Sequence, residues 1–185
     1  MNKAKLIVII FITLVVLGAG WYFLRVISGP NDSGPSGETF SSQDIGLSFV
    51  YPENYEIVQG DDEEGAVRIV TLTDKADLPV GQNTEGPPTI RVERFDNPQN
   101  LSLEEWIRTT PASNWHLSQS SIGDLGATTV GGEPSLGYLY SGLYDETVIA
   151  LAHNGKIYLF SVGVMSAQDK LKEDFFRIID SVKFI

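Results

Sequence analysis

Two apolar segments, residues 147–153 and 156–164, constrain the fold of this chain more than any other feature, and the dipeptide Asn154-Gly155 joins them. Asn and Gly tolerate the positive φ angles of a type I′ turn, so this spacing predicts a β-hairpin with a two-residue loop. The short loop fixes the register and pairs His153 with Lys156. The hairpin should therefore present well-defined sets of side chains on its two faces.

Both faces of the hairpin are apolar. The register places Ile149, Leu151, Tyr158, Phe160 and Val162 on one face and Val148, Ala150, Ala152, Ile157 and Leu159 on the other. A strand pair that is buried on both faces belongs in the centre of a sheet with cover on each side. We therefore predict an α+β fold, in which helices flank a central antiparallel sheet as an α/β/α sandwich.

Further strands and two helices follow from local patterns. Period-two alternation predicts strands at residues 40–43, 47–51, 55–59, 66–73, 89–95, 128–130 and 136–141, with a loop at 74–88. Ser102 and Glu105 have the spacing of a capping box, which predicts a helix that runs to Thr109 before Pro111 stops it.

The second helix is predicted to begin near Ser166, whose spacing to Asp169 is again typical of a cap. It places five apolar residues on one stripe, which must pack on the sheet: Leu171, Phe175, Ile178, Ile179 and Val182.

The N-terminal part of the chain contains a nineteen-residue apolar run, residues 6–24, in which Thr13 is the only strongly polar side chain. A helix of this length spans roughly 28 Å, close to the hydrocarbon thickness of a bilayer. Lys3 and Lys5 precede the run and Arg25 follows it. The run is therefore predicted to be a transmembrane helix with its N-terminus in the cytoplasm.

The alternative is a secretory signal peptide that is removed. Its apolar core would be shorter, and small residues would mark a cleavage site. Here Gly18-Ala19-Gly20 is followed by the bulky residues 21–24. We expect the segment to be retained as an anchor in a single-pass protein of the cell membrane, a layout that suggests a bacterial origin.

The expected organisation has four parts. Residues 1–5 are cytoplasmic, 6–24 span the membrane, 25–38 form a flexible tether rich in Gly, Pro and Ser, and 39–185 form one extracytoplasmic domain.

After Val26 the chain has 10 Lys and Arg against 24 Asp and Glu, a net charge of −14. This charge argues against a nucleic-acid partner, because a polyanion would be repelled. The chain lacks cysteine, which excludes disulfides, thiolate catalysis and lipid attachment at a cysteine.

Several short segments resemble the PsbP-like family, which takes its name from the extrinsic P subunit of photosystem II. They are residues 46–52 (GLSFVYP), 102–106 (SLEEW), 130–134 (VGGEP), 154–158 (NGKIY) and the helix-to-strand segment 175–184. The resemblance spans nearly all of residues 40–185. It implies a central antiparallel sheet with helices on both sides and a role in binding or assembly rather than catalysis.

No catalytic, cofactor-binding or metal-binding residue is predicted, and no cofactor is expected. The sequence lacks the nucleophile-elbow, zincin, P-loop and EF-hand patterns. His153 is expected to be an exposed residue beside the hairpin turn, and His116 a partly buried packing residue. Glu104 and Glu105 are explained by their place in the first turn of a helix.

Two clusters leave alternatives open. The run Asp61-Asp62-Glu63-Glu64 is expected to be a solvated turn, although four carboxylates could attract Ca²⁺. The aromatic residues Tyr138, Tyr140, Tyr144, Tyr158, Trp106 and Trp115 could line a groove for a ligand or peptide, or could simply pack in the core.

Three functional classes remain. The first is a membrane-anchored extracytoplasmic binding or assembly module, not an enzyme, that contacts an envelope protein or a small ligand. The second is an extracytoplasmic enzyme whose site is built from dispersed carboxylates. The third is a structural accessory of a membrane complex, in which Gly18-Ala19-Gly20 would permit close helix packing.

Overall fold

The computed structural model describes residues 37–61, 67–78, 86–118, 124–142, 144–164 and 169–185. The predicted transmembrane span at 6–24 and nearly all of the predicted tether lie outside these residues. Among the described residues, no helix combines the length and the apolar composition that crossing a bilayer requires.

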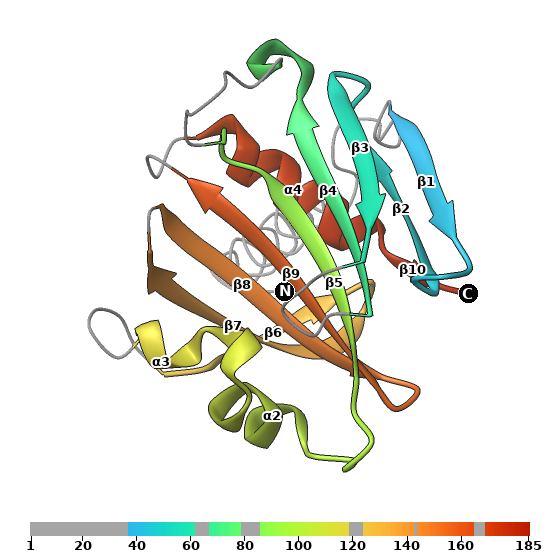
Figure 1. Ribbon diagram of the computed structural model, residues 1–185. Helices are drawn as coiled ribbons and strands as arrows, with labels where there is room; N and C mark the ends of the chain where they lie inside the picture. Colours follow the sequence, from blue (N-terminus) through green and yellow to red (C-terminus); the bar gives the residue numbers. More distant parts are fainter. Residues whose placement is uncertain (1–36, 62–66, 79–85, 119–123, 143, 165–168) are drawn as a thin grey trace, which may run out of the picture. The chain divides into compact units, whose positions relative to one another are not determined.

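A seven-stranded sheet organises the domain, with the strand order β3-β4-β5-β9-β8-β7-β6 and antiparallel pairing throughout (Figure 1). Its strands are β3 (Tyr55–Gly60), β4 (Arg68–Asp74), β5 (Ile90–Asp96), β6 (Gly126–Val130), β7 (Glu133–Ser141), β8 (Asp145–His153) and β9 (Lys156–Val164). Each lies at a position that the alternating patterns predicted, within a few residues at the ends. The antiparallel sheet is thereby confirmed.

The central hairpin β8-β9 has the predicted register, with His153 opposite Lys156. Asn154 and Gly155 have φ angles of 48° and 71°, as a type I′ turn requires. The two predicted faces contribute to two separate apolar cores, one on each side of the sheet. Ala152 is the exception: it is exposed near the hairpin tip, where its small side chain is not covered.

One face of the sheet is covered by α4 (Lys170–Ser181) and by a second, three-stranded sheet. That sheet has the order β1-β2-β10 and consists of β1 (Glu38–Ser42), β2 (Leu47–Tyr51) and β10 (Lys183–Phe184). The helix begins at Lys170 because the Asp169 carboxylate accepts a hydrogen bond from the Leu171 amide at 3.0 Å. The start predicted near Ser166 lies outside the described residues. The whole predicted apolar stripe is buried.

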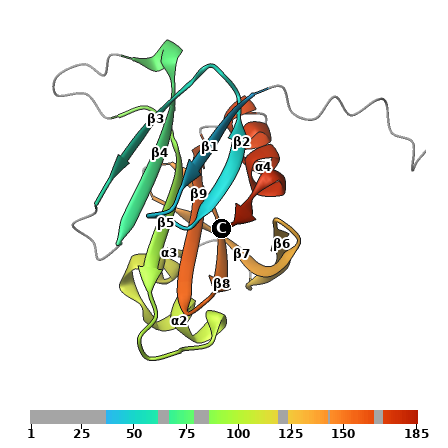
Figure 2. The same ribbon diagram turned by 90° about the vertical axis from the view of Figure 1, so that its right-hand side faces the viewer.

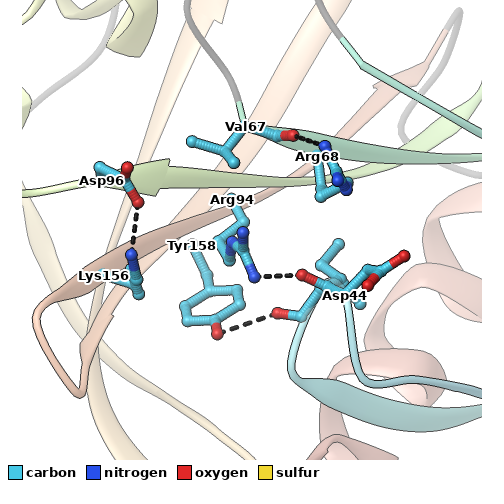
Figure 3. Close-up of polar contacts among 8 residues, drawn as sticks. Asp44, Val67, Arg68, Arg94, Asp96, Lys156 and Tyr158 are labelled. Atoms are coloured by element: carbon cyan, nitrogen blue, oxygen red, sulfur yellow. Dashed lines mark hydrogen bonds and ion pairs between the residues drawn. The ribbon is translucent and has the colours of Figure 1, made fainter.

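The turn between β1 and β2 is fastened to the large sheet by polar contacts (Figure 3). The Tyr158 hydroxyl donates to the carbonyl oxygen of Ile45 at 3.0 Å, and the Arg94 guanidinium donates to the carbonyl oxygen of Asp44. Ile45 is itself 1% exposed. These contacts fix the position of the small sheet relative to the large one.

Among the residues that the structure describes, the helical segments on the other face of the large sheet cover one end of it. There α2 (Leu103–Thr109), the 3₁₀ turn η2 (Pro111–Ser113) and α3 (Trp115–Ser118) pack against the strands. The predicted cap of α2 is present, since the Ser102 hydroxyl accepts from the Glu105 amide at 3.2 Å. Figure 2 shows α4 and the α2-α3 segment on opposite sides of the sheet. The fold is therefore a sheet-dominant α+β fold, with less helical cover than the predicted sandwich.

Candidate functional site

The part of the second face that α2 and α3 leave uncovered carries polar side chains. It spans five adjacent strands, and each of its six side chains is half-buried. We call this set the polar face; it consists of Thr71 on β4, Arg91 and Glu93 on β5, Ser161 on β9, Glu146 on β8 and Tyr140 on β7.

The strand register brings these side chains together. Arg91 lies directly opposite Ser161, and Glu146 lies directly opposite Tyr140. Only β9 separates the strand of Glu93 from the strand of Glu146. Glu93 lies opposite Leu159, and Glu146 lies opposite Gly163, four residues further along β9. The two carboxyl groups are therefore not neighbours in the sheet, although each lies within the electrostatic range of the other.

Charge on the polar face is partly paired. The Arg91 guanidinium binds the Glu93 carboxylate at 2.9 Å, and the Glu93 side chain is only 13% exposed. The Tyr140 hydroxyl accepts a hydrogen bond from the Asn114 side-chain amide at 3.4 Å. Asn114 ends the turn η2, so this contact joins the polar face to the segment that covers the apolar end of the sheet.

The carboxyl of Glu146 has a shifted pKa. Burial raises the pKa of its carboxyl to about 7; the nearby Arg91 guanidinium opposes this rise and the Glu93 carboxylate adds to it. Within the described part of the chain, the Glu146 carboxyl makes no hydrogen bond or ion pair. Glu146 therefore changes its charge near neutral pH.

Gly163 on β9 makes room for this carboxyl. Gly163 lies opposite Glu146 in the sheet, and a Cβ atom at position 163 would come within 2.7 Å of the Glu146 Oε1 atom. The same Cβ atom would lie 3.3 Å from the Cβ atom of Tyr144. The absence of a side chain at Gly163 thus lets Glu146 and Tyr144 pack down onto the sheet.

A pocket of about 450 Å³ lies beside Tyr144 and includes none of the six residues of the polar face. It is lined by Tyr55, Asp74, Asp77, Gly86, Pro87, Pro88, Tyr144, Asp169, Lys170 and Leu171. Tyr144 borders both features, because its Cβ atom lies near Gly163 and its hydroxyl donates to the Gly86 carbonyl oxygen at 3.0 Å. The pocket lies between η1 (Lys75–Asp77) and the start of α4.

Two of the three aspartates in this pocket cap helical turns. Asp74 accepts from the Ala76 amide at 2.9 Å and from the Asn54 side-chain amide at 2.7 Å, and Asp169 caps α4. The 3₁₀ turn η1 falls in a segment that was predicted to be a loop throughout. The caps give both acids a structural role, so the pocket by itself does not indicate a ligand.

The two histidines lie away from the polar face. His116 is exposed on α3, so its predicted packing role is wrong; its neighbour Trp115 is the buried residue. His153 lies at the hairpin tip, as predicted, but it is not simply exposed. Its ring stacks on Phe184 with centroids 4.0 Å apart, and its Nδ1 atom lies 3.0 Å from a Glu133 carboxylate oxygen.

The acidic clusters singled out in the sequence take structural places. Asp61 pairs with Arg68 at 2.5 Å, whereas residues 62–64 lie outside the described part of the chain. Glu104 pairs with Arg108 at 2.9 Å, and Glu105 lies in the first turn of α2. Within the ranges that the structure describes, no three acidic or histidine side chains are grouped to hold a metal ion.

The aromatic residues do not form one groove. Trp106, Trp115 and Tyr138 are buried in the core beneath α2 and α3. Tyr158 lies on the opposite face of the sheet. Only two members of the predicted set, Tyr140 and Tyr144, lie at or beside the polar face.

Part of the polar face could be recognised from its alternating pattern. Arg91 and Glu93 alternate with Ile90 and Val92, a pattern that indicates a half-exposed strand. No pattern singled out Glu146, because its burial depends on the distant Gly163.

Comparisons with known proteins identify the fold. No family model matches the sequence, and no curated protein matches it. Among solved structures, the cyanobacterial PsbP protein CyanoP from Synechocystis sp. PCC 6803 matches with a TM-score of 0.53 and 17% identity, over 85% of this chain and 100% of that one. A protein from Bacteroides thetaiotaomicron VPI-5482 matches with a TM-score of 0.51 and 14% identity over 80% of this chain, which spans 48% of that protein.

LpqN, described as involved in cell envelope biogenesis of Mycobacterium tuberculosis, matches with a TM-score of 0.41 and 14% identity, over 82% of this chain and 86% of that one. This score is too low to support a comparison of folds. The match to CyanoP covers the whole of that domain, and the large antiparallel sheet agrees with the resemblance seen in the sequence. The described domain has a PsbP-like fold.

Proposed function

We propose that this chain is a membrane-anchored, extracytoplasmic binding or assembly module without catalytic activity, and that the polar face is its contact surface. Its partner is an envelope protein or a small ligand. The observation that carries the proposal is the uneven cover of the sheet by the described residues: α4 and the small sheet cover one face, whereas the other presents a polar, half-buried surface across five strands.

The partial burial of the Glu146 carboxyl supports a contact surface at the polar face. A half-buried carboxyl such as Glu146 loses part of its hydration without gaining a described partner, which is unfavourable for the isolated domain. A partner that supplies a cationic or hydrogen-bonding group would offset this cost.

The location is supported by the sequence. The apolar run at 6–24 is long enough to span a bilayer, and the tether that follows would hold the domain beside the membrane. Lys3 and Lys5 favour a cytoplasmic N-terminus and hence an extracytoplasmic domain. Protease added to spheroplasts should digest the domain, and protease added to inverted vesicles should spare it; the reverse pattern would contradict this topology.

Site-specific photocrosslinking tests the contact surface. A photoreactive residue at Ser161 samples the polar face, and one at the exposed Glu173 of α4 samples the opposite side of the domain. In native membranes the full chain should give a reproducible adduct from position 161 and none of the same size from position 173. If position 161 gives no reproducible adduct, or if both positions give the same one, the polar face is not the contact surface.

The enzymatic alternative keeps one specific observation in its favour. Glu93 and Glu146 both lie on the polar face, and a carboxyl with a pKa of about 7 suits general acid or base catalysis. A substrate of such an enzyme would be turned over by the wild-type chain and not by the Glu146→Gln variant. A binding module predicts instead that this variant changes affinity and that no product forms.

A further inference from the structure

We propose that the polar face binds a basic segment of a protein partner, with a Lys or Arg side chain seated between Glu146 and Tyr140. This inference rests on the proposed function and specifies the chemistry of the partner. Glu146 and Tyr140 are directly paired on β8 and β7, so their side chains lie next to each other on the same side of the sheet. A carboxylate beside an aromatic ring suits a cation, which gains an ion pair and a contact with the ring face.

The charges on the polar face leave room for one more cation. Its two carboxyl groups belong to Glu93 and Glu146, and its one guanidinium, that of Arg91, is bound to Glu93 at 2.9 Å. Once Glu146 ionises, no cation in the described part of the chain lies within ion-pair distance of its carboxylate. A cationic side chain from a partner would neutralise this carboxylate and restore the interactions that it lost on burial.

An anionic ligand fits the same surface poorly. It would have to compete with Glu93 for Arg91 and would lie beside Glu146. The charge of the whole domain acts in the same direction, since residues after Val26 carry a net charge of −14. Such a charge repels anions and speeds the approach of a basic partner.

The width of the polar face suits a peptide segment rather than a single free cation. The polar face spans five strands, which is wide enough for several residues of an extended chain.

Binding should depend on pH through Glu146. The charged or titratable groups that face its carboxyl are Arg91 and Glu93 on β5 and Tyr140 on β7, with Tyr144 beside it. With a pKa of about 7, roughly 10% of Glu146 is ionised at pH 6 and roughly 90% at pH 8. If the ionised form is the one that binds, affinity should rise by up to about tenfold between these pH values.

The test uses the full chain in neutral detergent micelles and two blocked tripeptides, tri-lysine and tri-glutamate. Isothermal titration at pH 6 and pH 8 should show that tri-lysine binds, that it binds up to about tenfold more tightly at pH 8, and that tri-glutamate does not bind. The Glu146→Gln variant should bind tri-lysine more weakly and with no such rise. Glu173→Gln removes an equal charge from the exposed side of α4, so it should behave as the wild type.

Any of three results would overturn the inference: no binding of tri-lysine, equal binding of both peptides, or equal weakening by Glu146→Gln and Glu173→Gln. Circular dichroism establishes that each variant is folded. This experiment is separate from the photocrosslinking test. If position 161 gives a reproducible adduct but tri-lysine does not bind, the contact surface stands and its proposed preference for cations is refuted.

Discussion

Replacing Glu146 with Gln should stabilise the domain at alkaline pH and leave it almost unchanged at acidic pH. Burial raises the pKa of Glu146 from 4.5 to about 7. Between these values the folded chain holds the proton more tightly than the unfolded chain does. The free energy of unfolding therefore falls as the pH rises through this window, and the full penalty is present above about pH 8. Gln cannot ionise, so the variant escapes this penalty.

The size of the effect follows from the two pKa values. A rise from 4.5 to about 7 corresponds to about 3 kcal/mol for a fully shielded group. Glu146 is only half-buried, and solvent screens part of this energy, so we expect about 1 to 1.5 kcal/mol. At pH 5 the folded wild type carries a neutral carboxyl, which resembles an amide in size and charge. Because the carboxyl of the unfolded chain is already largely ionised at this pH, about a quarter of the full difference remains, roughly 0.3 kcal/mol, which is close to the error of the measurement.

Urea unfolding followed by tryptophan fluorescence measures this difference. Trp106 and Trp115 are buried in the core under α2 and α3 and report the loss of that core. The full chain in micelles should show a higher midpoint for Glu146→Gln than for the wild type at pH 8 and nearly equal midpoints at pH 5. Glu173→Gln, on exposed helix surface, serves as the control. A stabilisation of Glu146→Gln that is the same at both pH values, or that is absent at pH 8, would refute the reasoning.

Three further substitutions test other contacts. Tyr55→Phe removes the hydroxyl that donates a hydrogen bond to Asp174 at 3.0 Å, and the Asp174 side chain is only 1% exposed. The substitution should lower the free energy of unfolding by about 1 to 3 kcal/mol. An unchanged urea midpoint would contradict this. Gly131→Ala adds a Cβ atom at a φ angle of +54°, within 2.2 Å of a backbone carbonyl oxygen just past α4. This substitution should lower the free energy of unfolding by about 2 kcal/mol or more. An unchanged urea midpoint would disprove the close approach. Gly163→Ala should displace the Glu146 carboxyl toward solvent and bring its pKa back toward the ordinary value, which an NMR titration of the side chain can follow; a pKa that stays near 7 would show that Gly163 does not control the burial.

Much of the fold could be predicted from signals between residues that are close in the sequence. The dipeptide Asn154-Gly155 determines both the turn and the register of the central hairpin, and register then assigns every side chain of β8 and β9 to a face. The cap at Ser102 and the break at Pro111 likewise depend on neighbours within a few residues. Such features can be predicted because the interactions that decide them are close in the sequence.

The remainder depended on contacts between distant segments. The pattern of residues 40–51 predicted two strands but could not show that they join β10 in a separate sheet, since that pairing links β2 to residues 183–184. The exposure of His116 and the burial of Trp115 depend on where α3 lies against β7. Glu146 was not distinguished from other acids, because its environment is made by β5 and β9.

The pairing of β2 with β10 has a consequence for the order in which the domain folds. Ser48 lies opposite Lys183, so this contact closes a loop of about 135 residues and can form only after residues 183–184 have left the ribosome. The hairpin β1-β2, which is made first, therefore keeps one edge unpaired until these residues emerge. Chains truncated before Lys183 would keep that edge open and would be prone to aggregate.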